Sequence, residues 1–235
     1  PVRFVYDEQM PKDLFKYLVK SLNLKTGMNL IPGGKYHNFK DFTSFPNFGR
    51  SDFLFDKKIP SPHPLLENQK SLLRVIFQQD VLLHFPYQRF DSVVDLLREA
   101  AIDPKVTSIK INVYRVAGHS QVMNALLNAV SNGKEVIVVM ELQARFDEEN
   151  NLYWSNRLKE NGVKVLHGLA QLKIHSKLIQ IRRVSKGKEQ FVNYIGTGNF
   201  NEKTARIYGD LGLLTSDIAI SKEIKKVFHL IDNHF

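Results

Sequence analysis

The segment 171–201 carries a histidine, a lysine and a glycine-rich turn at spacings that suit phosphoryl transfer. His175 and Lys177 are two residues apart, so in a strand both side chains would point to the same face. The sequence Gly-Thr-Gly-Asn follows at 196–199, where small residues would let backbone N–H groups and the Asn199 amide approach a phosphate. Because a nucleophile, a cation and neutral donors occur together, we interpret this segment as a phosphoryl-transfer site.

An isolated histidine in a strand is more often a structural residue than a nucleophile. His175 is surrounded in sequence by cations, with Glu189 as the one acid among them: Lys173, Lys177, Arg182, Arg183, Lys186 and Lys188. Positive charge nearby lowers the pKa of an imidazole from about 6.5, which would keep His175 neutral and nucleophilic. We therefore favour a catalytic histidine, although the lysines of the Ser-Lys-Gly-Lys turn fit a solvated hairpin tip.

Helix-type and strand-type patterns alternate after residue 69, as expected for an α/β domain. The run 135–142 is almost wholly apolar, which is typical of a central strand covered on both faces. Ser120 is the expected cap of the helix that Gly133 ends. Other helices are predicted over 92–101 after the cap Asp91, over 147–161 and over 222–233, and other strands over 109–113, 163–167, 174–184 and 190–195.

Residues 53–69 predict an extended connector, because three prolines fall within five positions. Before it, apolar residues recur at helical spacing from Pro11 to Leu22. The phenylalanine-rich stretch that follows has no assigned structure. The first residue is proline and the last follows a helical pattern, so we expect the chain to be a fragment of a longer polypeptide.

Composition narrows the chemistry further. The sequence contains no cysteine, which excludes disulfides, thiolate metal sites and a cysteine nucleophile. A hydrophobic content of 43% is that of a folded globular protein rather than a disordered one. The net charge of +9 favours a polyanionic partner. No apolar run approaches the roughly 20 residues of a membrane span, so we expect a soluble protein.

Six motifs resemble, in the same order, those of the long bacterial polyphosphate kinases, whose catalytic core is related to phospholipase D. They are DVLLHFPYQRFD at 80–91, INVYR at 111–115, ELQARFDEENN at 141–151, KIHSK at 173–177, GTGNFN at 196–201 and TARIYGDLGLLT at 204–215. The resemblance implies a phospholipase D-like mixed sheet flanked by helices. Residues 62–235 would form the first catalytic domain, and residues 1–61 the end of the head domain, part of a second α/β domain.

The resemblance also implies reversible transfer of the ATP γ-phosphate to polyphosphate through a phosphohistidine at His175, with Lys177 as its catalytic partner. It places Tyr208 against ATP and Arg115 and Arg145 at a Mg²⁺ site. Guanidinium does not ligate metals, so we expect the two arginines to clamp phosphate oxygens that hold Mg²⁺. Asn199 would donate to the phosphoryl group. Without the resemblance, Arg115 would be a strand-end surface charge and Tyr208 a packed aromatic residue.

Weaker candidates have simpler explanations. The acids at 147–149 suit the dipole at a helix start without any metal. Asp210 is a candidate acidic partner of the nucleophile, although spacing alone does not establish it. The remaining histidines are expected to be structural or solvent-facing, except His84, which lies within a matching motif.

The implied partners are ATP, ADP and polyphosphate, the remaining domains of the polypeptide and, at full length, further copies of the chain; no nucleic acid is expected. The implied location is the cytoplasm or, through a larger complex, the periphery of the inner membrane. Because the chain has one His-x-Lys motif where the related enzymes use two, we expect it alone to have little synthetic activity. Two alternatives stay open. One is a phospholipase D-superfamily phosphodiesterase or nuclease, disfavoured by Arg182 where such enzymes have aspartate. The other is a nucleic-acid-binding domain that uses the positive charge.

Overall fold

The computed structural model describes residues 3–24, 29–35, 42, 46–56, 58–141, 148–168 and 173–233. The chain divides into two compact units, residues 1–57 and 58–235. In the smaller unit, β1 (Phe4–Asp7) pairs in parallel with β2 (Leu30–Gly33), and α1 (Lys12–Ser21) connects them. A 3₁₀ turn, η2 (Ser51–Phe53), follows. Helix α1 confirms the amphipathic pattern seen in the sequence. The assignment of residues 1–61 to the end of a head domain stays a prediction.

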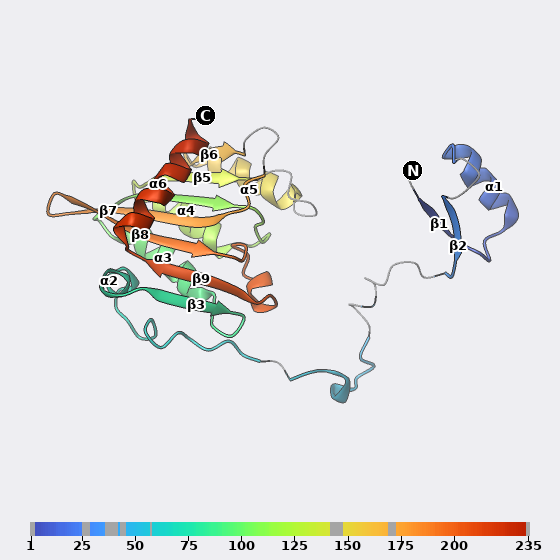
Figure 1. Cartoon of the computed structure of the whole chain (residues 1–235), viewed down its shortest axis with the longest axis horizontal. Coiled ribbons are helices and arrows are strands. Elements are labelled where there is room, and N and C mark those ends of the chain that lie inside the picture. Colours follow the sequence, from blue (N-terminus) through green and yellow to red (C-terminus); the bar gives the residue numbers. More distant parts are fainter. Residues whose placement is uncertain are drawn as a thin grey trace. The chain divides into compact units, whose positions relative to one another are not determined.

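The larger unit is built on a seven-stranded mixed sheet with the order β3-β9-β8-β7-β4-β5-β6 (Figure 1). Strands β4, β5 and β6 run parallel, whereas every pairing from β4 through β7, β8 and β9 to β3 is antiparallel. The strands are β3 (Val81–Phe85), β4 (Val106–Val113), β5 (Glu135–Met140), β6 (Lys164–His167), β7 (Lys177–Ser185), β8 (Lys188–Gly196) and β9 (Asp210–Thr215).

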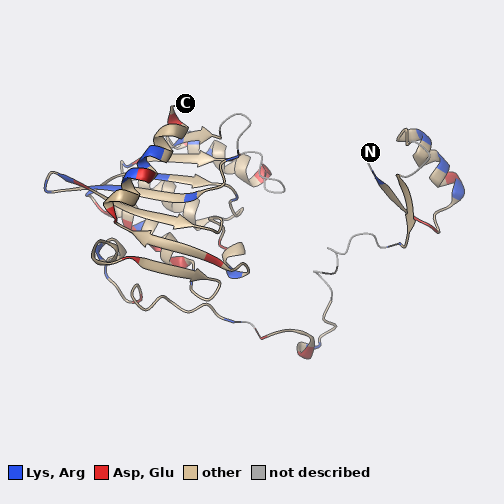
Figure 2. Cartoon of the chain, in the orientation of Figure 1, with Lys and Arg blue, Asp and Glu red and all other residues tan. Residues whose placement is uncertain are grey.

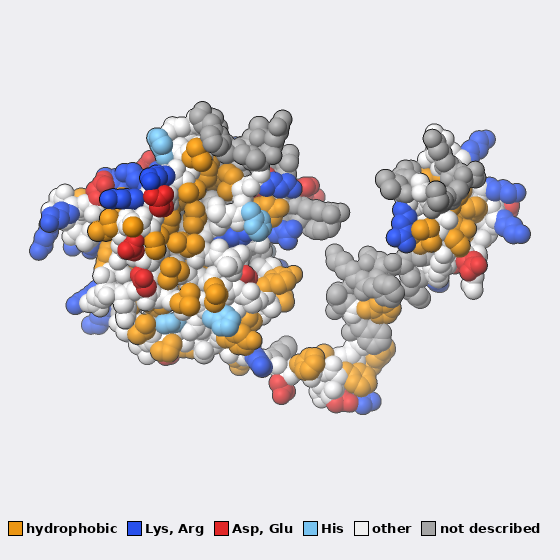
Figure 3. All heavy atoms as spheres, viewed as in Figure 1, with side chains coloured by type: hydrophobic (Ala, Val, Ile, Leu, Met, Phe, Trp, Pro, Cys, Tyr) orange, Lys and Arg blue, Asp and Glu red, His pale blue; other side chains and the backbone are white. Residues whose placement is uncertain are grey.

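Helices cover both faces of this sheet. They are α2 (Leu72–Gln78), α3 (Asp91–Ile102), α4 (Gln121–Ser131), α5 (Glu148–Glu160) and α6 (Ile218–Asp232), with a 3₁₀ turn, η3 (Thr204–Arg206). Buried side chains of α2, α3, α4 and α5 join the main core with Ile109, Ile111 and Ile179. Among the described helices, α6 is the one that covers the other face, where Ile224 and Phe228 pack with Leu178 and Val139. Figure 3 shows this second face, with hydrophobic side chains exposed beside α6.

Several local predictions are confirmed. The Ser120 hydroxyl accepts the Met123 N–H at the start of α4, and Gly133 ends that helix at φ +76°. Strand β5 lies between β4 and β6, with five of its six residues buried. The β7–β8 hairpin turns at Lys186 and Gly187, both with positive φ.

Other boundaries were wrong. Strand β7 begins at Lys177, not at residue 174, so His175 precedes the strand. Asp91 lies in the first turn of α3, and Phe90 takes the cap position. Helix α6 starts at Ile218 because Asp217 caps it through the Ile220 N–H. Strands β1, β2, β3 and β9 and helix α2 were not predicted. Within the described part of the chain, no helix is both long and apolar enough to cross a bilayer.

Candidate functional site

The segments that carry the predicted chemistry lie at one end of the strands of the larger sheet. This row of strand ends, not an outer strand, is called the edge below. The strand directions bring the carboxyl ends of β3, β4, β5, β6 and β8 to this edge, together with the amino ends of β7 and β9. The candidates are therefore arranged along the edge in the order of the strands: His84, Tyr208, Asn199, His175 with Lys177, and Arg115. Arg145 follows β5 and lies outside the described residues. In α/β folds, ligands commonly bind outside the carboxyl ends of the strands, at the point where the order of strand connections reverses.

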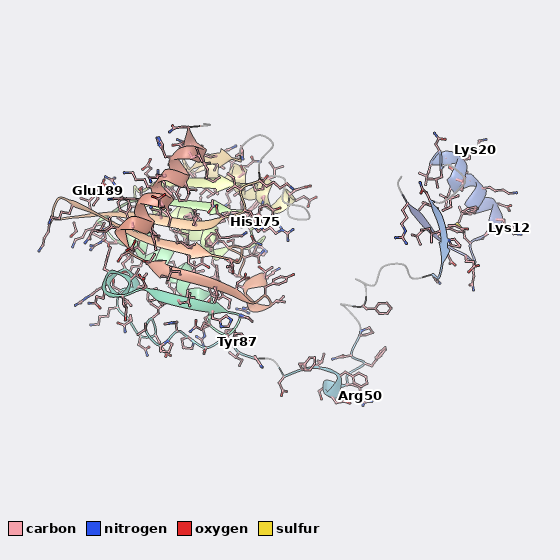
Figure 4. The ribbon with its side chains drawn as sticks, viewed as in Figure 1. Lys12, Lys20, Arg50, Tyr87, His175 and Glu189 are labelled. Atoms are coloured by element: carbon pink, nitrogen blue, oxygen red, sulfur yellow. The ribbon has the colours of Figure 1, made fainter. Side chains whose placement is uncertain are left out.

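Lys177 and His175 form the centre of the candidate site. Lys177 is the first residue of β7 and only 3% exposed, whereas His175 is exposed at the end of the sheet (Figure 4). The Lys177 Nζ lies 3.0 Å from His175 Nδ1 and 3.2 Å from Nε2, and it also donates to the His175 carbonyl. A cation is thus held directly beside an accessible imidazole, as a charge-stabilised phosphoryl transfer would need.

Tyr114 and Arg115 border this pair from the end of β4. The Tyr114 ring meets the His175 ring edge-on, with centroids 5.1 Å apart. The same aromatic ring has the Lys177 Nζ at 5.8 Å and the Arg115 guanidinium carbon at 5.7 Å from its centroid. Asn151 of α5 fixes this segment, because its Nδ2 donates to the Tyr114 carbonyl at 2.9 Å and to the Glu141 carbonyl at 2.8 Å. Neither Tyr114 nor Asn151 was singled out from the sequence, although both lie within quoted motifs.

Electrostatics link Lys177 to a carboxylate. Burial lowers the pKa of the Lys177 ammonium from 10.5; Asp210 acts in the opposite direction, and Arg115 lowers it further. Asp210 begins β9 and accepts a hydrogen bond from the Thr197 hydroxyl at 2.8 Å. Asp210 therefore acts on the buried lysine through its charge, an influence that spacing in the sequence could not establish.

The glycines of the 196–199 segment serve the packing of neighbouring side chains. A Cβ on Gly196 would lie 2.5 Å from the Tyr194 ring, and one on Gly198 would lie 2.5 Å from the Asp210 carboxylate. The Thr197 N–H donates to the Leu211 carbonyl at 3.0 Å. These contacts differ from the expected exposure of backbone amides: the small residues make room for Tyr194 and Asp210, and the Thr197 amide is already used.

Asn199 follows the end of β8, whose Gly196 pairs with Lys177 across the ladder. Its Oδ1 is buried and finds no hydrogen-bond partner among the described residues. Buried side-chain oxygens are normally satisfied. An amide oxygen accepts hydrogen bonds, so the unused Oδ1 is open to a donor such as water, whereas the predicted donation to a phosphoryl oxygen would come from Nδ2.

Tyr208 and His84 lie farther along the edge. Tyr208 is 61% exposed and lies two residues before the start of β9. His84 is exposed on β3, with its ring 4.8 Å from that of Tyr87. Three strand spacings of about 4.8 Å separate β3 from β7, so the fold does not bring His84 to His175.

The cations that surround His175 in sequence are mostly remote from it in space. Arg182 pairs with Glu189 at 2.5 Å, and Arg183 pairs with Asp103 at 2.9 Å. Five residues of strand, about 17 Å, separate Arg182 from Lys177. Figure 4 shows Glu189 and His175 at opposite ends of β7 and β8, and Figure 2 shows the basic hairpin tip. Of the expected cations, Lys177 is the one with a described contact to the imidazole, and Arg115 comes from β4 to the Tyr114 ring beside it.

The predicted Mg²⁺ site was assigned to Arg115 and Arg145, and guanidinium groups do not themselves ligate a metal. Across the residues that the structure describes, no group of three or more histidine, aspartate or glutamate side chains could hold a metal ion.

Comparison with known proteins relates this edge to a family. A family model described as polyphosphate kinase C-terminal domain 1 matches residues 71–235. A polyphosphate kinase of Vibrio vulnificus is 52% identical over 241 residues, covering 100% of this chain and 34% of that relative. The crystal structure of polyphosphate kinase from Porphyromonas gingivalis matches with a TM-score of 0.84 at 36% identity, covering 99% of this chain and 36% of that one.

The fold is also that of a more distant protein. The crystal structure of the phospholipase D family member Nuc from Salmonella typhimurium matches with a TM-score of 0.51 at 16% identity, over 66% of this chain and 95% of that one. This likeness concerns the fold alone, and it confirms the predicted phospholipase D-like architecture. The chain spans about a third of the length of the curated relatives that it matches. Since the family match takes in most of the chain and the identity extends along all of it, the chain belongs to the polyphosphate kinase family.

Proposed function

We propose that the protein containing this chain is an ATP:polyphosphate phosphotransferase and that His175 carries the phosphoryl group between the two substrates. The observation that carries the proposal is the contact between the buried Lys177 ammonium and the exposed His175 ring. The relatives named polyphosphate kinase supply the substrate class. Because the chain covers 34% of such a relative, the activity is proposed for the whole protein.

In the proposed first step, a nitrogen of His175 forms a P–N bond with the γ-phosphorus of ATP. The bond from that phosphorus to the bridging oxygen breaks, and ADP leaves with the electron pair. In the second step a terminal oxygen of polyphosphate attacks the same phosphorus and the P–N bond breaks. Each step reverses by the same path, which suits transfer in either direction.

Neighbouring groups have distinct roles in this proposal. Lys177 and Arg115 neutralise the charge on the phosphate oxygens, and Asn199 donates a neutral hydrogen bond. Asp210 balances the charge of Lys177 while the site is empty. Tyr208, exposed at the same edge, is the proposed contact for ATP, and Arg145 would add a second guanidinium. Mg²⁺ would bind with the phosphate oxygens of ATP, which such sites combine with one or two protein carboxylates, and would offset their negative charge.

The hydrolase alternative is less well supported. Arg182 occupies the position five residues after Lys177, where the lipase-type pattern has an aspartate. It lies well inside β7 and pairs with Glu189 rather than with any group of the site. The chain therefore lacks the carboxylate that a phosphodiesterase of the usual phospholipase D type has at this position.

The proposal is tested by incubating the full-length protein with ATP labelled at the γ-phosphate. Label that is stable to alkali and labile to acid should appear in the peptide containing His175 and pass to added polyphosphate. His175→Ala should abolish labelling, whereas His229→Ala, which removes an exposed histidine of α6, should leave it unchanged. Retained labelling in His175→Ala would refute the assignment. The 235-residue chain alone should synthesise little polyphosphate.

A further inference from the structure

Asn112 makes three short hydrogen bonds to the backbone and side chain of the segment that presents His175. It is a buried residue of β4, only 1% exposed. Its Nδ2 donates to the Ser176 carbonyl and to the Ser176 hydroxyl, both at 2.6 Å. Its Oδ1 accepts the Leu178 N–H, also at 2.6 Å. One side chain thus holds the backbone on both sides of Lys177.

These hydrogen bonds connect β4 to the start of β7 beyond the last residue pair of the ladder between the two strands. The pairing of β4 with β7 ends at Ile111 opposite Ile179, although β4 itself continues to Val113. Beyond that pair, the Asn112 amide supplies both a donor and an acceptor to the start of β7. The chain can therefore leave the sheet at residue 176 while its backbone remains fixed to β4.

The position of the Lys177 ammonium depends on this fixed backbone. Lys177 reaches back to the His175 carbonyl and ring, so a displacement of residues 176–178 would move the cation and the imidazole together. We propose that Asn112 is a positioning residue that sets the placement of the His175-Ser176-Lys177 segment for phosphoryl transfer. Its kinetic consequence rests on the proposed function of His175, whereas the placement itself does not.

A purely structural role is the competing explanation, and the chain offers a matched control. Asn193 of β8 is also a buried asparagine, 0% exposed, with three side-chain hydrogen bonds. It accepts from Gln180 at 3.0 Å and donates to Ser221 at 2.7 Å and to the Thr215 carbonyl at 3.4 Å. Removing it should disturb the sheet beneath α6 without touching the segment 173–178.

The first experiment measures amide hydrogen exchange in the full-length protein without substrates. Asn112→Ala should raise the exchange rate of peptides covering 173–178 about tenfold, since a tenfold rate ratio reflects the loss of a hydrogen bond of ordinary strength. Asn193→Ala should leave these peptides at the wild-type rate. Unchanged exchange in Asn112→Ala, or an equal rise in both variants, would overturn the proposed placement.

The second experiment compares the kinetics of Asn112→Ala and Asn193→Ala, each assayed at the same interval below its own Tm. Asn112→Ala should lower kcat for polyphosphate synthesis about 100-fold with little change in KM for ATP, because small misplacements of reacting groups cost about that much. Asn193→Ala should keep kcat near the wild-type value. Equal kcat losses in the two variants would reduce Asn112 to a structural residue. If wild-type His175 takes up no label, the proposed function fails, and the exchange result still decides the placement.

If Asn112→Ala does not fold, Asn112→Asp and Asn193→Asp replace the alanine pair. Asp at position 112 retains an acceptor for the Leu178 N–H but loses the donors to Ser176. Increased exchange should then be confined to residues 173–177, with an intermediate loss of kcat. Full wild-type exchange and kcat in Asn112→Asp would contradict the proposal.

Discussion

The ammonium of Lys177 lies 3.0 Å from Nδ1 of His175, although Lys177 is buried and His175 is open to solvent. The lysine ammonium is therefore the buried member of the pair, and the imidazole is the member that a substrate can reach. A cation placed in this way is partly desolvated before any substrate arrives, so in the proposed reaction its field would act on the phosphate with little reorganisation. The arrangement has consequences for stability as well as for chemistry.

Lys177 should make stability depend on pH in the alkaline range. Burial lowers the pKa of its ammonium in the folded protein below the ordinary 10.5. Between the folded and the unfolded pKa the unfolded chain binds more protons, so the free energy of unfolding rises with pH there. Below the folded pKa both states are protonated, and the penalty of burying the charge is constant. Lys177→Met should remove this rise.

Urea unfolding from about pH 7 to about pH 10.5 tests the Lys177 prediction. The wild-type protein should gain stability relative to Lys177→Met as the pH increases. Lys222→Met, which changes an exposed lysine of α6, should follow the wild-type slope. Parallel curves for wild type and Lys177→Met would contradict the prediction.

Gly212 should be intolerant of any side chain because of Tyr194. A Cβ at Gly212 would lie 2.5 Å from Cε2 of the Tyr194 ring, which is itself 1% exposed and cannot move aside freely. Overpacking of this kind destabilises by about 1–3 kcal/mol, so Gly212→Ala should lower the free energy of unfolding by that amount. Chemical denaturation provides the measurement.

Gly209 is the control for this substitution. A Cβ there meets nothing within 4 Å, so Gly209→Ala should change stability by no more than about 0.5 kcal/mol. Combining Gly212→Ala with Tyr194→Leu should cost less than the sum of the two single changes, because the smaller side chain leaves room for the methyl group. Strictly additive losses of stability would show that the Tyr194 ring does not hinder a side chain at position 212.

Gly198→Ala should reduce activity as well as stability. A Cβ at Gly198 would lie 2.5 Å from Oδ2, 2.6 Å from Cγ and 2.9 Å from Cβ of Asp210. Rotation of the carboxylate would break its hydrogen bond with the Thr197 hydroxyl and change its electrostatic effect on Lys177, yet would leave the contact with the Asp210 Cβ. We expect labelling of His175 to slow about tenfold or more, with a loss of stability of about 1–3 kcal/mol. A fall in stability with normal labelling would contradict this reading.

Local chemistry made much of the larger unit predictable. Ser120 caps the start of α4, and Gly133 ends the helix in a left-handed conformation. The apolar run of β5 predicts a strand that is buried on both faces. Strands β3 and β9 were missed because the exposed positions Leu82 and Leu211 are apolar, so polarity in the sequence does not follow the alternation of buried and exposed sides, and the two strands are defined by pairing with each other and with β8. Helix α2 depends on Glu99, a residue of α3 that accepts the N–H groups of Leu72 and Leu73.

The candidate site was predictable to the level of its motifs but not of its contacts. The spacing of His175 and Lys177 indicated a shared surface, and the two side chains do meet, although His175 precedes the strand. Sequence proximity misled for Arg182, because an extended strand carries neighbours apart at about 3.4 Å per residue. Asn112 and Asp210 act across strand pairings, and one sequence without its register gives no measure of such distances.

Glu202, which follows the glycine-rich segment 196–199 in sequence, should stabilise the start of α4. Its Oε1 accepts the Gln121 N–H at 2.7 Å, the Val122 N–H at 3.2 Å and the Ser120 hydroxyl at 3.1 Å. A carboxylate at a helix start satisfies orphan donors and suits the helix dipole. Glu202→Ala should therefore lower the free energy of unfolding by about 1–2 kcal/mol, and Glu202→Gln by less, since its amide oxygen can still accept.

The contribution of Glu202 can be separated from a general surface effect by chemical denaturation of three further variants. Glu67→Ala removes an exposed glutamate of a turn and should change stability little. Ser120→Ala should lower stability by about 1 kcal/mol through loss of the Met123 cap. The Glu202→Ala and Ser120→Ala double variant should deviate from additivity, because the two side chains share a hydrogen bond and one helix end. An additive result would show that Glu202 and Ser120 support α4 independently.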